Sequence, residues 1–181
     1  MSSRINPTLF DKLVADLEVA GPEVDDLRDD GKEMSGFDRS SLRFYTVARI
    51  ERFNEAALRA TVLRELNWLL NTTNLAAVQD LSAVPEVATS TLNYGLGDLT
   101  GRLLTRSGVQ ARAREMREAI ARFEPRIERR SLVVESDATR TRPNSVGFVI
   151  RGDLTPAVQA FPVEFRTDVE VDTGTTTLWT A

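Results

Sequence analysis

The residues that could do acid–base chemistry in this chain are carboxylates, because its 181 residues include neither histidine nor cysteine. That excludes disulfides, thiol chemistry, most transition-metal sites and histidine-based catalysis. Two carboxylates can still hydrolyse a glycosidic bond when they flank a sugar and burial raises the pKa of one of them. The candidates for such a pair are Glu65, Asp98, Glu124 and Glu164.

These carboxylates lack the surroundings that a glycosidase needs. Glu65 falls within an expected helix, and Arg126 beside Glu124 favours the charged carboxylate over the protonated acid. The two Trp and two Tyr residues give no sign of an aromatic-lined sugar groove. We therefore expect no enzyme, no cofactor and no metal site, and keep a carboxylate-based peptidoglycan hydrolase as the weaker alternative.

The composition is that of a soluble globular protein, with 41% hydrophobic and 28% charged residues. The net charge of -4 argues against non-specific nucleic-acid binding. No apolar run approaches the roughly 20 residues that cross a bilayer, and the N-terminus is not typical of a secretory signal. We expect a cytoplasmic protein without direct membrane insertion. Apart from Lys12 and Lys32, every basic residue is Arg, the better side chain for binding carboxylates.

The N-terminal third divides into two parts. Asn6 and Pro7 are typical of a helix start, and apolar residues at helical spacing predict a helix over residues 1–20. Residues 21–53 contain an acidic stretch, interpreted as a linker, and a variable segment that fits neither the helical nor the strand period.

Residues 54–181 predict a single α+β domain. Apolar stripes indicate a helix from Asn54 to about residue 70 and another over 105–123. Runs rich in β-branched residues follow at 132–134, 146–151, from Val163 onward, and at 175–180. Strands that follow helices in blocks predict N-terminal helices packed on a C-terminal antiparallel sheet of about four strands, with a parallel strand allowed at an edge.

Three motifs in this domain, taken in order, resemble one family. They are the helix 62–72 that ends in Leu-Leu-Asn-Thr, the loop 90–101 with Asn-Tyr-Gly-Leu-Gly-Asp-Leu, and Phe-Glu-Pro-Arg-Ile at 123–127. Together they are similar to the baseplate wedge family that includes TssE of type VI secretion and the gene-25 product of T-even phages. Gly97 stands where that family commonly has Pro.

The resemblance implies a structural wedge subunit of a contractile injection machine, of the type VI secretion kind. Its expected partners are the wedge proteins TssF and TssG, with TssK as a further candidate, and the sheath proteins TssB and TssC. Its expected place is the cytoplasmic baseplate docked at the inner membrane through partners. A contractile phage tail, a tailocin, an extracellular injection particle or an unrelated adaptor remain alternatives.

The segment Glu124-Pro125-Arg126 is the expected contact with the wedge core. Pro125 forbids continuation of the helix and fixes a corner before the first strand. The two charges beside it either pair with each other or, as the resemblance implies, contact the core of the wedge. Both roles are compatible.

The loop motif is interpreted as a structural turn made by Asn93, Tyr94, Gly95 and Asp98. We expect Gly95 to take a positive φ, Asn93 to bond its own backbone and Tyr94 to be a packed anchor. Asp98 is expected to cap the turn at residues 99–100.

The last strand is the candidate contact with the sheath. Its residues 175–180 have high β propensity and neither Pro nor charge, which is unusual for an exposed sheet edge. Either the strand lies inside the sheet or its edge accepts a strand from another chain. The second reading follows from the resemblance, without showing which edge is used. The contact candidates are Thr175, Thr177, Leu178 and Trp179.

Overall fold

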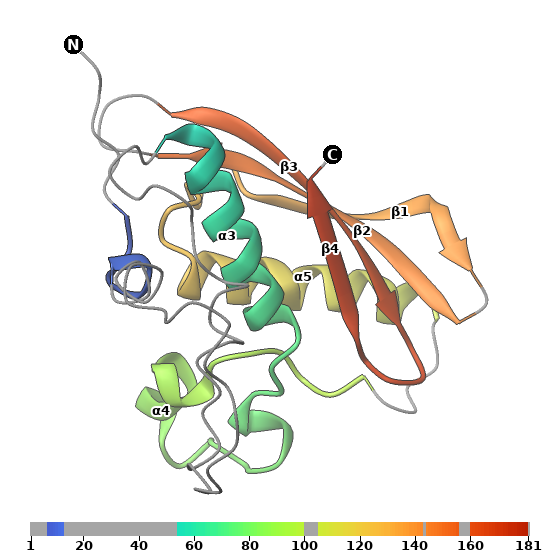
Figure 1. Ribbon diagram of the computed structural model, residues 1–181. Helices are drawn as coiled ribbons and strands as arrows, with labels where there is room; N and C mark the ends of the chain where they lie inside the picture. Colours follow the sequence, from blue (N-terminus) through green and yellow to red (C-terminus); the bar gives the residue numbers. More distant parts are fainter. Residues whose placement is uncertain (1–6, 13–53, 100–104, 143, 156–159, 181) are drawn as a thin grey trace, which may run out of the picture. The chain divides into compact units, whose positions relative to one another are not determined.

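The computed structural model describes residues 7–12, 54–99, 105–142, 144–155 and 160–180 (Figure 1). The chain divides into two compact units, residues 1–61 and 62–181. The acidic linker and variable segment expected at 21–53 lie outside the described residues. No helix in the described part of the chain is long and apolar enough to span a membrane.

The first helix begins two residues later than the sequence indicates. Residues 9–12 are helical, and Thr8 acts as the N-cap in place of Asn6. The Thr8 hydroxyl accepts a hydrogen bond from the Asp11 amide, and the Asp11 carboxylate accepts one from the Thr8 amide, each at 3.2 Å. This reciprocal pairing satisfies two amides that a helix start leaves open. The remainder of the helix expected to residue 20 falls outside the described residues.

Two long helices confirm the apolar stripes of the sequence. Helix α3 spans Glu55–Leu70, and its Asn54 cap accepts a hydrogen bond from the Ala57 amide at 2.9 Å. Helix α5 spans Arg106–Phe123 and is capped by Thr105. Between them lie the short helices η3 (Leu75–Ala77), α4 (Pro85–Thr89) and η4 (Thr91–Asn93). The buried apolar residues of α3 and α5 are Leu58, Val62, Leu66, Leu69, Leu70, Ala113, Met116, Ala119 and Ile120.

Four strands form one antiparallel sheet after these helices, which confirms the α+β class. They are β1 (Val133–Arg142), β2 (Ser145–Leu154), β3 (Phe161–Glu170) and β4 (Thr176–Thr180), in the order β1-β2-β3-β4. Every pairing in this sheet is antiparallel, so the parallel edge strand that the sequence allowed is not found in it.

Strand β1 is longer than the sequence pattern indicates. Residues 135–142 are mostly polar and were expected to connect two strands, yet they continue β1, and residues 135–137 and 142 pair with β2. The register runs from Val133 opposite Arg151 to Asp137 opposite Gly147, and it shifts before Arg142 meets Ser145. A polar edge strand is held by its backbone hydrogen bonds and needs no apolar face of its own. This explains why the residue composition did not predict a strand here.

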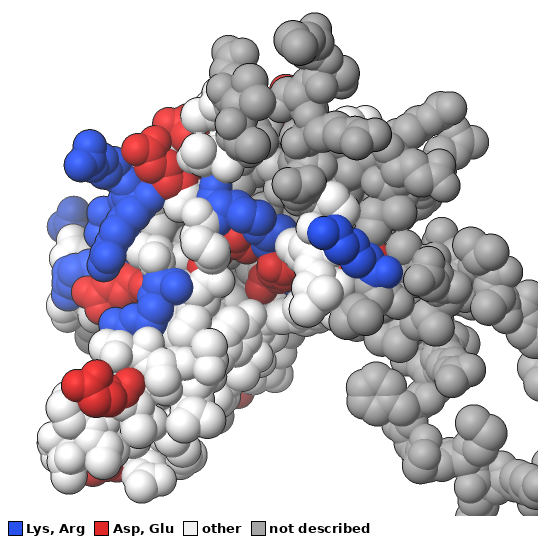
Figure 2. All heavy atoms as spheres, turned by 90° about the vertical axis from the view of Figure 1, so that its left-hand side faces the viewer, with Lys and Arg blue, Asp and Glu red and all other residues white. Residues whose placement is uncertain are grey.

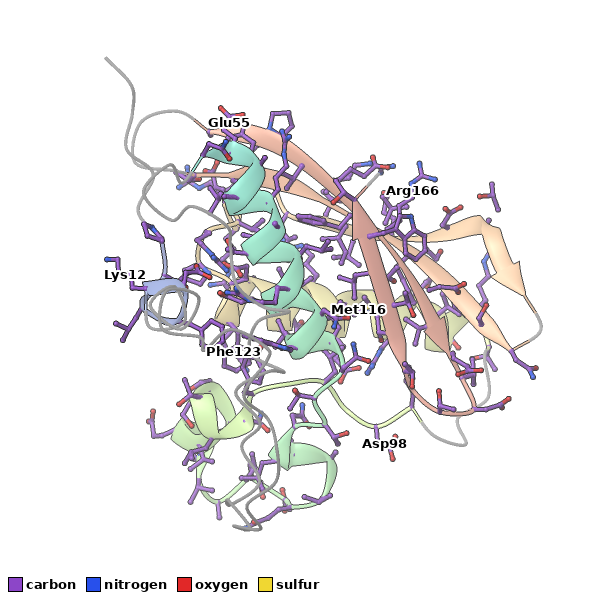
Figure 3. All side chains as sticks on the ribbon, in the orientation of Figure 1. Lys12, Glu55, Asp98, Met116, Phe123 and Arg166 are labelled. Carbon is purple, nitrogen blue, oxygen red and sulfur yellow. The ribbon has the colours of Figure 1, made fainter. Side chains whose placement is uncertain are left out.

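The two faces of the sheet differ in character. On the inner face, Phe148 is opposite Thr167 and Ile150 is opposite Phe165, all at 2% exposure or less. Helix α5 packs against this sheet through β1. Figure 3 shows Met116 of α5 among the interior side chains and Arg166 at the outer side of the sheet. The core therefore lies between the helices and the inner face.

Candidate functional site

The Glu-Pro-Arg segment forms a corner between α5 and the sheet. Helix α5 ends at Phe123, and the Glu124 amide donates the last helical hydrogen bond, to the Ile120 carbonyl at 2.9 Å. Pro125 cannot continue the helix. The Arg126 carbonyl then accepts a hydrogen bond from the Thr155 amide at 2.9 Å, which fastens the corner just beyond β2. The corner is therefore held at both ends by backbone bonds.

The charges of the corner pair with each other. The Arg126 guanidinium donates from Nε to Glu124 Oε1 at 2.7 Å and from Nη2 to Glu124 Oε2 at 2.5 Å. Such a two-point pairing is among the stronger charged hydrogen bonds in proteins. The side chain of Glu124 is 3% exposed and that of Arg126 is 19% exposed. Glu124 is thus closed within the chain, whereas Pro125 is exposed and Arg126 is half-buried.

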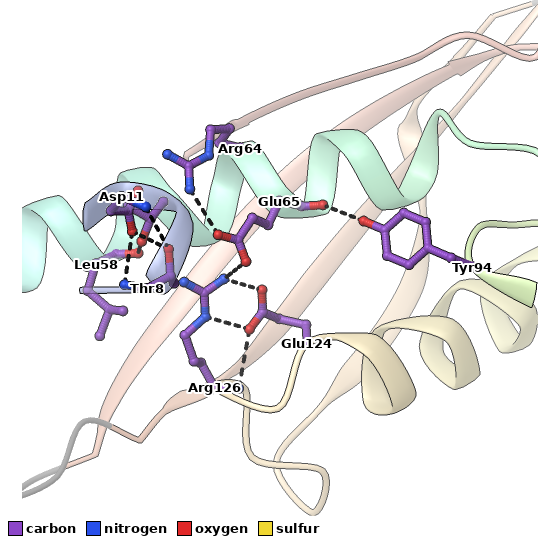
Figure 4. A network of polar contacts seen from close by, with 9 residues as sticks. Thr8, Asp11, Leu58, Arg64, Glu65, Tyr94, Glu124 and Arg126 are labelled. Atoms are coloured by element: carbon purple, nitrogen blue, oxygen red, sulfur yellow. Dashed lines mark hydrogen bonds and ion pairs between the residues drawn. The ribbon is translucent and has the colours of Figure 1, made fainter. Parts of the chain in front are cut away.

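A third member of the cluster, Glu65 of α3, was not expected here. Its carboxylate accepts from Arg126 Nη2 and, at 2.9 Å, from Arg64 Nη2 (Figure 4). Burial raises the pKa of Glu65, and the nearby Glu124 carboxylate raises that pKa further, while Arg126 and Arg64 act in the opposite direction. The sequence separation of 61 residues explains why no local pattern could indicate this contact.

This arrangement does not make a glycosidase pair. Glu65 and Glu124 bind the same guanidinium, which occupies the space between them where a sugar would have to lie. Asp98 is exposed in the loop after η4, and Glu164 on β3 binds Arg151 and Arg166. Within the described residues, no group of three or more acidic side chains is placed to hold a metal ion.

The loop motif supports the corner from the side of α3. The Tyr94 ring meets the Phe123 ring edge-on at 5.2 Å, and its hydroxyl donates to the Glu65 carbonyl at 3.4 Å. Burial, with help from the two nearby carboxylates, raises the pKa of Tyr94 to about 12. Tyr94 therefore stays protonated at physiological pH and bridges the end of α5 to α3.

Gly95 has the expected positive φ, at 114°, and a Cβ there would lie 2.2 Å from the Thr72 carbonyl oxygen. The expectation for Asn93 is wrong. Its amide does not close a local turn but accepts from the Ala76 amide at 2.8 Å and donates to the Ala88 carbonyl at 3.0 Å. Asn93 therefore joins η3 to α4. The cap expected from Asp98 at residues 99–100 falls partly outside the described residues.

Strand β4 lies at one edge of the sheet and β1 at the other. The Glu170 amide bonds the Thr175 carbonyl at 2.9 Å, which marks a hydrogen-bonded pair in the register of β3 with β4. Because such pairs alternate, Thr176, Leu178 and Thr180 point their backbone N–H and C=O groups away from β3. The sequence candidates Thr177 and Trp179 instead direct theirs into the ladder, and Thr175 precedes the strand.

The outward groups of Thr176 are already occupied. The Asn71 side-chain amide accepts from the Thr176 amide and donates to the Thr176 carbonyl, each at 2.8 Å. Asn71 thereby imitates one residue of an added strand. Sequence reasoning missed this contact, although an Asn just after a helix is a signal for side-chain bonding to backbone. The part of the β4 edge beyond Asn71 carries Leu178 and Thr180.

Comparison with known proteins gives one finding. The family model described as baseplate wedge protein gp25 matches residues 56–157, more than half of the chain. This range contains α3 from its second residue on, the loop motif, α5, the corner and the first two strands. Neither the curated proteins nor the solved structures give a match.

Proposed function

This chain belongs to the baseplate wedge protein gp25 family, and we propose that it is the TssE-type wedge subunit of a type VI secretion baseplate. The family gives the chain a structural role in the baseplate of a contractile injection system, among other baseplate and tail components. In the proposed role it joins the wedge core to the sheath, stays on the cytoplasmic side of the inner membrane through its partners and catalyses no reaction.

The observation that carries the sheath role is the edge of β4. Leu178 and Thr180 direct N–H and C=O groups away from the sheet in a strand with no charge and no Pro. An exposed strand edge of this kind can pair with a strand of another chain. Most proteins therefore block such edges with charged residues, proline or a bulge, and β4 has neither a charged residue nor a proline. We expect this edge to accept a strand from the first ring of sheath proteins, TssB and TssC, by β-strand addition.

The corner is the proposed contact with the wedge core proteins TssF and TssG, with TssK as a further candidate. Its internal pairing supports this role because the Arg126 fork is fixed in one orientation before a partner arrives. A side chain ordered in advance loses less entropy on binding. Pro125 and the accessible part of Arg126 would then form the contact, with buried Glu124 holding them in place.

The test of the sheath role separates a backbone donor from its side chain. Leu178→Pro removes the side chain and the outward N–H, whereas the control Leu178→Ala removes the side chain alone. Baseplates that carry the proline variant should initiate sheaths at least about tenfold less often, the equivalent of one lost hydrogen bond. The alanine variant should initiate as the unaltered protein does. If both variants initiate sheaths equally often, the β4 edge does not accept a strand from the sheath.

Two further readings have their own tests. The same role in a contractile phage tail, a tailocin or an extracellular injection particle would place the chain among the genes of those particles. A peptidoglycan hydrolase would clear a cell-wall suspension, and purified protein should leave its turbidity unchanged. Clearing that disappears in Glu65→Gln would restore the enzymatic reading.

A further inference from the structure

Helix α5 and the turn after it carry a group of arginines that the fold does not use as ions. They are Arg106, Arg114, Arg117, Arg122, Arg129 and Arg130, and all six are exposed. In the part of the chain that the structure describes, none of these six side chains lies in an ion pair. By contrast, ion pairs are formed by Arg64, Arg112, Arg126, Arg151 and Arg166.

Three of these arginines share one side of α5. At 3.6 residues per turn, Arg106, Arg114 and Arg117 fall within an arc of about 80°, over a length of about 16 Å. The arc lies about 80° to 160° around the helix from buried Met116, so it runs from the flank of the buried side to the far side. Arg117 Nε donates to the Leu132 carbonyl at 3.0 Å, which ties this side of the helix to the turn that precedes β1. We call the arginine stripe the set Arg106, Arg114, Arg117, Arg129 and Arg130.

Within its own two segments, the charge of the stripe is offset only in part. The exposed acids of α5 and the turn after it are Glu118 and Glu128, against six exposed arginines. Arg114 and Arg117 stand three residues apart on the helix, and like charges at that spacing cost stability. The chain as a whole is acidic, at -4, and the stripe is therefore not a by-product of a basic composition. Figure 2 shows basic side chains interspersed with acidic ones over one part of the surface, above an almost uncharged part.

Other regions of the molecule satisfy their arginines internally. On the outer face of the sheet, Arg151 binds Glu135 at 3.2 Å and Glu164 at 2.8 Å, and Arg166 binds Glu164 at 3.2 Å. Arg151 of β2 thus finds acidic partners on both neighbouring strands, and Arg166 finds one on its own strand, β3. Among the described residues, the arginines on the outer face of the sheet are thus paired with acids, whereas those of the stripe are not.

We infer that the arginine stripe is a second docking surface, which binds an acidic protein surface on a neighbouring subunit of the wedge. The inference rests on the proposed function. Arg is the side chain best suited to carboxylates, because its planar fork offers paired donors. The fitting partner carries carboxylates spread over about 16 Å, for example along one side of a helix. Protein is favoured over nucleic acid because the whole chain is acidic and its family assembles with proteins.

The experiment uses the full-length chain and the purified wedge core complex of TssF and TssG from the same cell. A triple charge reversal, Arg106→Glu with Arg114→Glu and Arg117→Glu, should raise the dissociation constant by about 100-fold, because it sets like charges against each other. The matched control replaces the same three residues by Lys and should stay within about tenfold of the unaltered chain. The affinity of the unaltered chain should fall with added salt, and that of the reversal variant should not.

Each other outcome has a distinct meaning. If the unaltered chain does not bind the wedge core, the proposed function fails. If it binds and the reversal variant binds equally well, the arginine stripe is not a docking surface, while the proposed function stands. If the reversal abolishes binding to a DNA duplex at physiological salt and leaves wedge binding intact, the partner class is wrong. If the arginines serve only the chain's own acidic residues 23–38, reversal lowers thermal stability without changing the dissociation constant, which also overturns the inference.

Discussion

The Glu-Pro-Arg corner and the arginine stripe lie on the same helix and its continuation, yet they treat charge in opposite ways. At the corner, Arg126 binds both Glu124 and Glu65, and the Glu124 side chain is 3% exposed. Along the stripe, Arg106, Arg114 and Arg117 are exposed and form no ion pair with the described residues. The corner uses its charges to hold the chain, and the stripe leaves its charges for another molecule.

The same contrast appears in the backbone of β4. At Thr176 the outward N–H and C=O groups are bonded by the Asn71 amide, whereas Leu178 and Thr180 direct theirs outward beyond it. Groups that are bonded within the chain (closed groups) and groups that are directed outward (open groups) should therefore respond differently to substitution. Changes at closed groups should cost folding stability. Changes at open groups should cost assembly and leave the fold intact.

The largest expected effect is at the corner. Arg126→Ala leaves buried Glu124 without its charged partner and should lower the free energy of unfolding by about 3–5 kcal/mol, measured by urea denaturation. The double variant Glu124→Ala with Arg126→Ala removes both charges. Its loss should be smaller than the sum of the two single losses by more than about 1 kcal/mol.

The same double variant also tests the contact of the corner with the wedge core. The double variant should keep the far-UV circular dichroism of the folded chain while it weakens association with the wedge core. If the double variant is fully unfolded, the role of the corner is internal, and its contact with the wedge core is not supported.

A much smaller effect on folding is expected at the stripe. Replacing Arg106, Arg114 and Arg117 by Gln removes no described ion pair. Arg106→Gln and Arg114→Gln should each alter the free energy of unfolding by less than about 0.5 kcal/mol. Arg117→Gln also loses the hydrogen bond to the Leu132 carbonyl, so this change should lower the free energy of unfolding by about 1 kcal/mol. A loss of more than about 2 kcal/mol for the triple variant would show that the stripe is part of the fold.

The smallest effect concerns Glu65 and depends on pH. Because burial raises its pKa in the folded state, the protonated form is favoured by folding. The stability from this group is fully present below its ordinary pKa of 4.5 and is lost as the pH rises through the raised value. Glu65→Gln stays neutral, so its thermal stability relative to the unaltered chain should increase over that pH range. A difference that is flat or falls with pH would contradict this account of Glu65.

The sequence predicts the fold well where periodicity is strong. The apolar stripes at 54–70 and 105–123 give α3 and α5 almost to the residue, since one side of each helix is buried. Strand β1 is underestimated because its residues 135–142 are held by backbone pairing, which leaves no mark on hydrophobicity. The Thr8 cap shows the same limit at a helix start, where a reciprocal bond with Asp11 prevails over the Asn6-Pro7 signal.

The candidate site is predicted in its parts and not in its connections. Glu124, Pro125 and Arg126 are adjacent in the chain, so their meeting at one corner follows from local chemistry. The contact of Arg126 with Glu65, and that of Asn71 with Thr176, join residues 61 and 105 positions apart. Such contacts depend on how the helices lie on the sheet, which no single motif specifies.

The most direct measurement is hydrogen exchange of the β4 amides before and after assembly. In the chain alone, the Leu178 and Thr180 amides should exchange quickly, while those of Thr177 and Trp179 are protected by the ladder with β3. In baseplates joined to sheath, all four should exchange slowly, because a strand from the sheath covers the outer edge. Leu178 and Thr180 amides that remain fast after sheath assembly would contradict the claim that this edge recruits the sheath.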